Sequence, residues 1–133
     1  MDIALCTFDL ETFHLQFSGA NRPLWIFRNG ERIEIKPDKL AIGGFRKNRD
    51  TMFTNHEMHL QSGDTIYLFT DGFADQFGGP FGKKLLSKRF REVLSSIQNL
   101  SMREQEKNLT AVFTEWKGNV TQVDDVLVIG IRV

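Results

Sequence analysis

The stretch from Asp64 to Asp75 constrains the fold more than any other, because in it a buried strand ends in an acidic turn. The run from Ile66 to Phe69 is apolar and carries the β-branched and aromatic residues typical of a buried strand. It ends in Thr70-Asp71-Gly72. A carboxylate after a buried strand, followed by a flexible glycine, is well placed to hold charge at a sheet edge. The alternative is that Asp71 caps the next segment.

A second acidic motif lies near the C-terminus, where Asp124 and Asp125 directly precede the apolar run Val126–Ile131. If this strand and the one ending at Phe69 are antiparallel neighbours, Asp71 and Asp124 meet at one end of the sheet. Close carboxylates repel and raise each other's pKa unless a cation lies between them. Oxygen ligands favour a hard ion such as Mg²⁺ or Mn²⁺. The two motifs therefore predict a divalent-metal site.

Length and charge exclude several classes of protein. The 133 residues suit one domain or part of one, and a hydrophobic content of 41% is enough to build a core. Basic and acidic residues balance at 17 each, which argues against a general nucleic-acid or membrane-surface binder. No apolar run approaches the ~20 residues that a membrane helix needs. A single cysteine, Cys6, and a start at Met1 without a signal-peptide pattern favour the cytoplasm.

Hydrophobic alternation and turn residues predict about seven strands. The expected strands are residues 3–8, 13–17, 24–27, 32–35, 54–60, 66–69 and 126–133. Asn29-Gly30 is the preferred two-residue hairpin turn, so the strands on either side of it should pair antiparallel. Residues 38–55 are expected to be irregular.

Two helices are expected before the last strand. Apolar residues recur at helical spacing over 85–97, and Ser101 with Glu104 forms a capping box for a helix that ends at Gly118. Residues 76–84 are interpreted as a mobile flap beside a site, or as a linker. The basic residues from Lys83 to Arg91 are interpreted as a solvated face, with an anionic partner as the second choice. The predicted class is α+β, with antiparallel β-sandwich-type sheets and two helices packed on one face.

Four motifs in this order resemble a known family. They are a G-A-x-x-P-L loop at Gly19–Leu24, a G-D-x-x-x-L-F-T-D-G strand at Gly63–Gly72, a later F-G helix start and the terminal D-D strand. Together they resemble the C-terminal half of the SpoIIE-type serine phosphatases, a bacterial branch of the metal-dependent, protein phosphatase 2C-like enzymes. The resemblance runs from about Ile3 to Val133 and implies one incomplete phosphatase domain over residues 1–133.

The resemblance implies roles for five residues. Asp71 and Asp124 match the family's metal-binding aspartates, and Gly72 belongs to the first motif. Asp75 and Asp125 match neighbouring acidic positions and are possible secondary ligands. The family reaction uses two ions, Mn²⁺ or Mg²⁺, bridged by a water that attacks phosphoserine or phosphothreonine in line. The implied substrate is a phosphorylated protein such as an anti-sigma-factor antagonist, and a sensor or repeat domain is expected upstream.

One family motif has no counterpart in this chain. The first metal motif, an aspartate followed closely by G-H-G, would lie before Met1. The isolated chain is therefore expected to show little or no turnover, as the C-terminal part of a phosphatase. The alternative is a non-catalytic protein-interaction module that retains the phosphatase fold. Sheet edges left uncovered also predict self-association of the chain.

Overall fold

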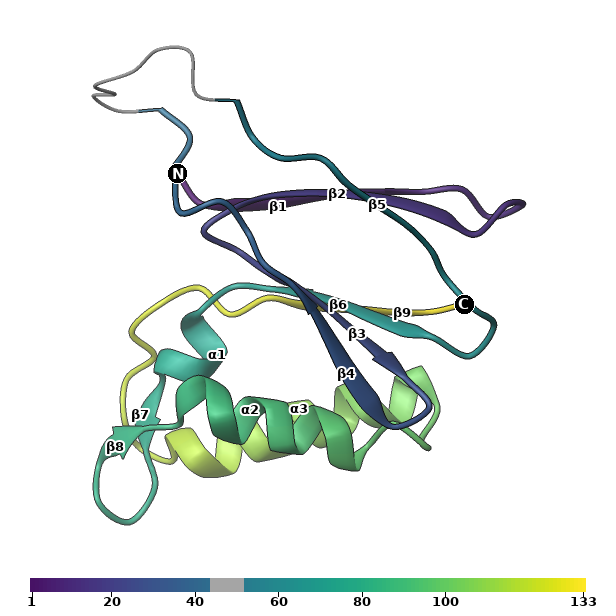
Figure 1. The fold of residues 1–133 in the computed structure, drawn as a ribbon. Coiled ribbons are helices and arrows are strands. Elements are labelled where there is room, and N and C mark those ends of the chain that lie inside the picture. Colours follow the sequence, from purple (N-terminus) through teal and green to yellow (C-terminus); the bar gives the residue numbers. More distant parts are fainter. Residues whose placement is uncertain (44–51) are drawn as a thin grey trace. The chain divides into compact units, whose positions relative to one another are not determined.

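The computed structural model describes residues 1–43 and 52–133 of the chain (Figure 1). These residues form two compact units. The first unit contains Met1–Leu68 and Ile131–Val133, and the second contains Phe69–Gly130. Of the stretch 38–55, which was predicted to be irregular, residues 44–51 lie outside the described residues.

A three-stranded antiparallel sheet in the first unit has the order β1-β2-β5. Its strands are β1 at Ile3–Phe8, β2 at His14–Ala20 and β5 at His56–His59. The strand predicted over 13–17 begins one residue later than expected. Phe13 has a positive φ of 55° and belongs to the turn before the strand, and this turn removes its side chain from the alternation seen at Leu15 and Phe17.

A four-stranded sheet has the order β4-β3-β6-β9. Its strands are β3 at Leu24–Arg28, β4 at Glu31–Ile35, β6 at Thr65–Phe69 and β9 at Val128–Arg132. The hairpin predicted at Asn29-Gly30 is confirmed. Both turn residues have positive φ, at 50° and 82°, and Arg28 pairs with Glu31 across the turn. Such a turn matches the right-handed twist of the strands that it joins.

The core of the first unit comes from alternate residues of its strands. Ala4, Cys6 and Phe8 of β1 pack against this core, while Ile3 and Leu5 of the same strand are exposed. The buried core residues are Leu15, Phe17, Leu24, Ile26, Ile35, Leu60 and Ile66. In β1 and β2 the buried side chains follow a period of two, whereas Leu24–Phe27 of β3 are all buried.

β1 lies at the edge of its sheet, and Ile3 and Leu5 expose apolar surface there. An edge strand with no charged residue between Ile3 and Phe8 has little to prevent pairing with another chain. Self-association stays a prediction. In the described part of the chain, no helix has the length and apolar character needed to cross a membrane.

The second unit contains the helices, which are α1 at Gly72–Asp75, α2 at Leu86–Ser96 and α3 at Met102–Lys117. The capping box is confirmed, because Glu104 Oε2 accepts from the Ser101 backbone N–H at 2.9 Å and Glu104 N donates to Ser101 Oγ at 3.4 Å. Phe73 of α1 packs on Phe90 of α2 and Phe113 of α3, with ring centroids 4.5 and 5.3 Å apart. These aromatic contacts join the three helices into one cluster.

The interpretation of residues 76–84 as a flap or plain linker is incomplete. They form a small antiparallel hairpin of β7 at Phe77–Gly78 and β8 at Lys83–Lys84. The short α1 was also missed. Strands of two residues and a four-residue helix are too short to produce a recognisable period in the sequence. The α+β class with antiparallel sheets and two long helices is confirmed.

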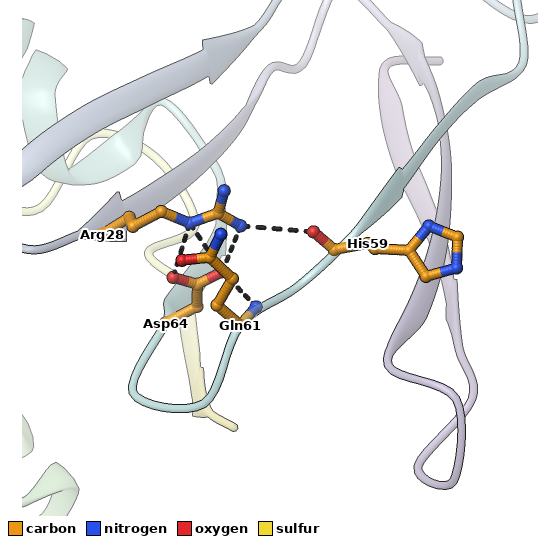
Figure 2. A network of polar contacts seen from close by, with 4 residues as sticks. All are labelled: Arg28, His59, Gln61 and Asp64. Atoms are coloured by element: carbon orange, nitrogen blue, oxygen red, sulfur yellow. Dashed lines mark hydrogen bonds and ion pairs between the residues drawn. The ribbon is translucent and has the colours of Figure 1, made fainter.

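A buried charge pair joins three segments of the first unit (Figure 2). Asp64 is 1% exposed, and Arg28 donates to it through Nη2 at 2.6 Å and Nε at 3.0 Å. The Gln61 backbone N–H donates to the same carboxylate at 2.8 Å, and Arg28 Nη2 donates to the His59 carbonyl at 3.2 Å. Burial raises the pKa of Asp64, but the hydrogen bonds from Arg28 and Gln61 and the Arg28 charge outweigh it and hold the pKa below its ordinary value.

Asp64→Asn is expected to lower the free energy of unfolding by about 3 kcal/mol at neutral pH, because it leaves Arg28 without its buried partner. A lowered folded-state pKa stabilises the protein above the ordinary carboxyl pKa, and this contribution is lost as the pH falls through the folded value. The difference between wild type and variant should therefore shrink in acid. Urea denaturation at pH 7 and at decreasing pH measures both effects. Asp2→Asn, in an exposed pair with Arg22, is the matched control and should change stability far less.

Candidate functional site

The Thr70 side chain joins the two acidic segments within the second unit. Its Oγ1 donates to the Asp125 carbonyl at 2.8 Å and accepts from the Leu127 backbone N–H at 3.0 Å. The Thr70 backbone N–H also donates to the Leu127 carbonyl at 3.0 Å. Three hydrogen bonds thus hold the turn after β6 against the segment before β9.

The strand arrangement assumed from the sequence is present. β6 and β9 are neighbours in the sheet order. Asp64 bonds to Val133 at one end of this strand pair, and Thr70 bonds to Leu127 at the other. Residue numbers that rise along one strand and fall along the other mean that the two strands run antiparallel. The end of β6 therefore lies beside the start of β9.

Gly72 permits an approach that no other residue would allow. A Cβ at this position would lie 2.3 Å from the Asp125 carbonyl oxygen and 2.9 Å from its carbonyl carbon. Both atoms are backbone and cannot rotate away. The glycine of the T-D-G motif is therefore required by the contact between the two segments, and not by its φ, which is not positive.

Asp71 begins α1 with its backbone, since its carbonyl accepts from the Asp75 N–H at 2.9 Å. Its half-buried side chain makes no capping hydrogen bond to that helix. Asp71 thus occupies the N-cap position of α1, as the alternative interpretation expected, but its side chain does not form the cap. The carboxylate belongs to the turn that Thr70 and Gly72 press against the second acidic segment.

The other acidic residues have different surroundings. Asp124 is exposed, and its Oδ1 accepts from the Asp125 N–H at 2.7 Å. Asp125 contributes its carbonyl to the bond with Thr70. Asp75 pairs with Lys84 Nζ at 3.2 Å. Because a lysine already neutralises Asp75, it is a weaker candidate for a metal ligand than Asp71 or Asp124.

The donors fit a hard divalent cation in kind. Asp71 and Asp124 offer carboxylate oxygens, which Mg²⁺ and Mn²⁺ prefer. Across residues 1–43 and 52–133, no three His, Cys, Asp or Glu side chains gather closely enough to hold an ion. These two carboxylates would therefore supply only part of a coordination shell. The roles of Asp71, Gly72, Asp124, Asp75 and Asp125 in metal binding stay predictions.

Sequence reasoning missed the part played by Thr70. Its signal was a hydroxyl residue between a buried strand and the aspartate, where a side chain that both donates and accepts can bond a neighbouring strand. The neighbour itself is 55 residues away, so nothing local to Thr70 identified it.

Comparisons with known proteins agree with this fold. A family model described as Stage II sporulation protein E (SpoIIE) matches residues 1–133. The chain is similar to the SiaA-PP2C domain of Pseudomonas aeruginosa, with 34% identity and a TM-score of 0.88 over 99% of this chain and 51% of that one. Comparison with curated protein sequences gives no match.

Two further solved structures share the fold at lower identity. One is the Mn-presoaked phosphatase domain of the cell fate determinant SpoIIE from Bacillus subtilis, with 15% identity and a TM-score of 0.66 over 99% of this chain and 56% of that one. The other is RsbX in complex with magnesium, with 18% identity and a TM-score of 0.61 over 97% of this chain and 54% of that one. The chain thus spans about half the length of these structures. Its fold is that of PP2C-type phosphatase domains, which confirms the resemblance read from the motifs.

Thr70→Val is expected to lower the free energy of unfolding by about 1 kcal/mol, because the nearly isosteric side chain removes two hydrogen bonds at the junction. Urea denaturation measures the loss. Thr110→Val makes the same change on the exposed surface of α3 and should be nearly neutral. Equal effects of the two substitutions would contradict the role given to the Thr70 hydroxyl.

Gly72→Ala is expected to cost about 2 kcal/mol, because the added methyl group must push the Asp125 backbone away. The Leu127 amide hydrogen, which bonds to Thr70, should then exchange with solvent faster. Hydrogen exchange measured by NMR reports this directly. Unchanged protection of Leu127 would show that the junction tolerates a side chain at position 72.

Proposed function

This chain belongs to the SpoIIE family, and from that membership we propose that it is the C-terminal part of a metal-dependent phosphatase domain acting on phosphoserine or phosphothreonine in a protein. The observation that carries the proposal is the Thr70 and Gly72 junction, which holds the segments of Asp71 and Asp124 together. Because the chain spans about half of its solved relatives, the remaining ligands would come from the rest of a longer protein.

Asp71 and Asp124 are the residues that would hold a divalent ion. Mn²⁺ or Mg²⁺ is proposed, since one similar structure was presoaked with Mn and another holds magnesium. Bound ions would supply Lewis-acid activation of water and stabilisation of the phosphoryl oxygens, in a binuclear site in the complete domain. Thr70 and Gly72 act as positioning residues, because they fix the backbone on which both carboxylates are carried.

Lys84 and Asp75 contribute to the charge near the site. Their ion pair of 3.2 Å neutralises the acidic residue at the end of α1, so it does not add to the repulsion around Asp71.

The Cys6 thiol lies in β1, and burial raises its pKa, which disfavours the thiolate that nucleophilic chemistry needs. The raised pKa of the thiol agrees with direct attack by water rather than with a covalent cysteine intermediate.

Several parts of the proposal rest on family membership alone. They are a phosphorylated anti-sigma-factor antagonist as substrate, an upstream sensor or repeat domain, a single domain over residues 1–133 and a cytoplasmic location. A PP2C fold is compatible with each of them, and each concerns the longer protein rather than a contact within this chain.

A second candidate is a non-catalytic interaction module with the phosphatase fold. It is favoured by one observation, which is that three metal-binding side chains are not found together among the described residues. The two candidates differ in what the upstream sequence supplies. An aspartate and G-H-G motif before Met1 would complete the ligand set, and its absence there would favour the interaction module.

Asp71→Asn is expected to reduce phosphate release at least about 100-fold in a longer chain that carries the genomic sequence before Met1, because even outer-shell partners of metals are worth 10–100-fold in affinity. The assay uses Mn²⁺ and a phosphoserine peptide. Glu106→Gln, on the exposed surface of α3, is the control and should retain activity. The 133-residue chain should release phosphate only at background level. An inactive longer chain, or one unaffected by Asp71→Asn, would refute the proposal.

A further inference from the structure

The β7–β8 hairpin, residues Phe77 to Lys84, presents an aromatic ring to solvent. Phe81 lies in its loop and is 82% exposed. The loop projects away from α2 and α3 (Figure 1). A phenylalanine placed in this way adds almost nothing to the core of the second unit. Exposed aromatic rings of this kind are enriched among the residues that anchor protein interfaces.

The backbone at the base of the hairpin is held firmly. Gly79 N donates to the Trp116 carbonyl at 2.7 Å, Leu85 N donates to the Gln76 carbonyl at 3.0 Å, and Trp116 Nε1 donates to the same Gln76 carbonyl at 3.0 Å. A Cβ on Gly78 would overlap the Trp116 carbonyl oxygen, at 1.8 Å. The base is thus packed on the end of α3, so the hairpin itself would lose little conformational entropy when a partner binds.

Positive charge concentrates on and next to the hairpin. Residues 76–91 carry five basic side chains and no acidic one, in a chain whose formal net charge is zero, and the flanking Asp75 and Glu92 pair with Lys84 and Arg89. The five are Lys83, Lys84, Lys88, Arg89 and Arg91. Lys84 lies 5.7 Å from the Phe77 ring centroid and pairs with Asp75. Lys83 is exposed and makes no ion pair within the described part of the chain. This local excess complements an acidic partner.

We propose that the β7–β8 hairpin is the docking element for an acidic segment of the phosphoprotein substrate, with Phe81 as its apolar anchor and Lys83 as its main charged contact. The proposal rests on the proposed phosphatase function and specifies which part of the substrate is recognised. Only α1 separates Asp71 from the hairpin in sequence, and the Lys84–Asp75 pair joins the hairpin to α1. An acidic segment bound here would therefore lie next to the turn that carries Asp71.

Fluorescence anisotropy tests the docking with the 133-residue chain. The probe is a short fluorescein-labelled peptide with one phosphoserine flanked by Glu, Asp and Leu. A second peptide replaces each Glu and Asp with Gln and Asn. The acidic peptide should bind, its affinity should fall with salt, and the neutral peptide should bind about tenfold more weakly. The measurement needs no turnover, so its failure is distinct from failure of the Asp71→Asn test.

Two substitutions and two matched controls locate the binding. Phe81→Ser should weaken the acidic peptide about tenfold, as loss of an aromatic anchor does. Lys83→Glu should weaken it about fivefold and reduce the salt dependence. Leu10→Ser, at a side chain that is 79% exposed in the first unit, and Lys107→Glu, on exposed α3, should leave the affinity unchanged.

Four results would overturn the docking proposal. One is no binding of the acidic peptide to the wild-type chain. Another is equal binding of the acidic and neutral peptides, and a third is equal loss in the hairpin variants and their controls. The fourth is co-sedimentation with vesicles of phosphatidylglycerol and phosphatidylcholine without peptide binding, since it would assign the basic residues and Phe81 to a membrane surface.

Discussion

The Thr70 hydroxyl links two segments that lie 55 residues apart in the chain, and the arrangement of the candidate site depends on this link. It donates to the Asp125 carbonyl and accepts from the Leu127 N–H, so it uses both of its hydrogen-bonding capacities. Gly72 makes the contact possible, since any Cβ would meet the Asp125 backbone. The hydrogen bonds of Thr70 and the close approach at Gly72 thus stabilise the same junction. Two acidic motifs that are each weak signals alone become one structural feature because of it.

Carboxylates have different surroundings in the two units. In the first unit, a carboxylate that is almost fully buried is bonded by a guanidinium and a backbone N–H, which keeps Asp64 charged (Figure 2). In the second unit, the acidic residues of the candidate site are exposed or half-buried, and one of them is paired with Lys84. A buried carboxylate with fixed partners serves stability. Carboxylates that remain accessible at a strand end can accept a further partner, such as a metal ion.

The hairpin next to the site shows the opposite of core packing. Its base is bonded to Trp116 and Gln76, yet the ring of Phe81 at its tip is exposed. Holding an aromatic ring exposed to water is unfavourable, and it adds nothing to the stability of the second unit. The surrounding basic residues give the same surface a preferred type of partner, and together these features connect the hairpin to recognition.

The sequence by itself determined the features that depend on neighbours along the chain. Asn29-Gly30 required positive φ at both positions, the alternation at Leu15 and Phe17 required one buried face, and Ser101 with Glu104 closed a capping box. These are short-range effects of sterics and local hydrogen bonds. The motif order also indicated the PP2C-type fold. The absence of a side-chain cap at Asp71, the two hydrogen bonds of the Thr70 hydroxyl and the pairing of Arg28 with Asp64 were decided only by tertiary structure. Each joins residues that no local pattern relates, and each exists only after distant strands have paired.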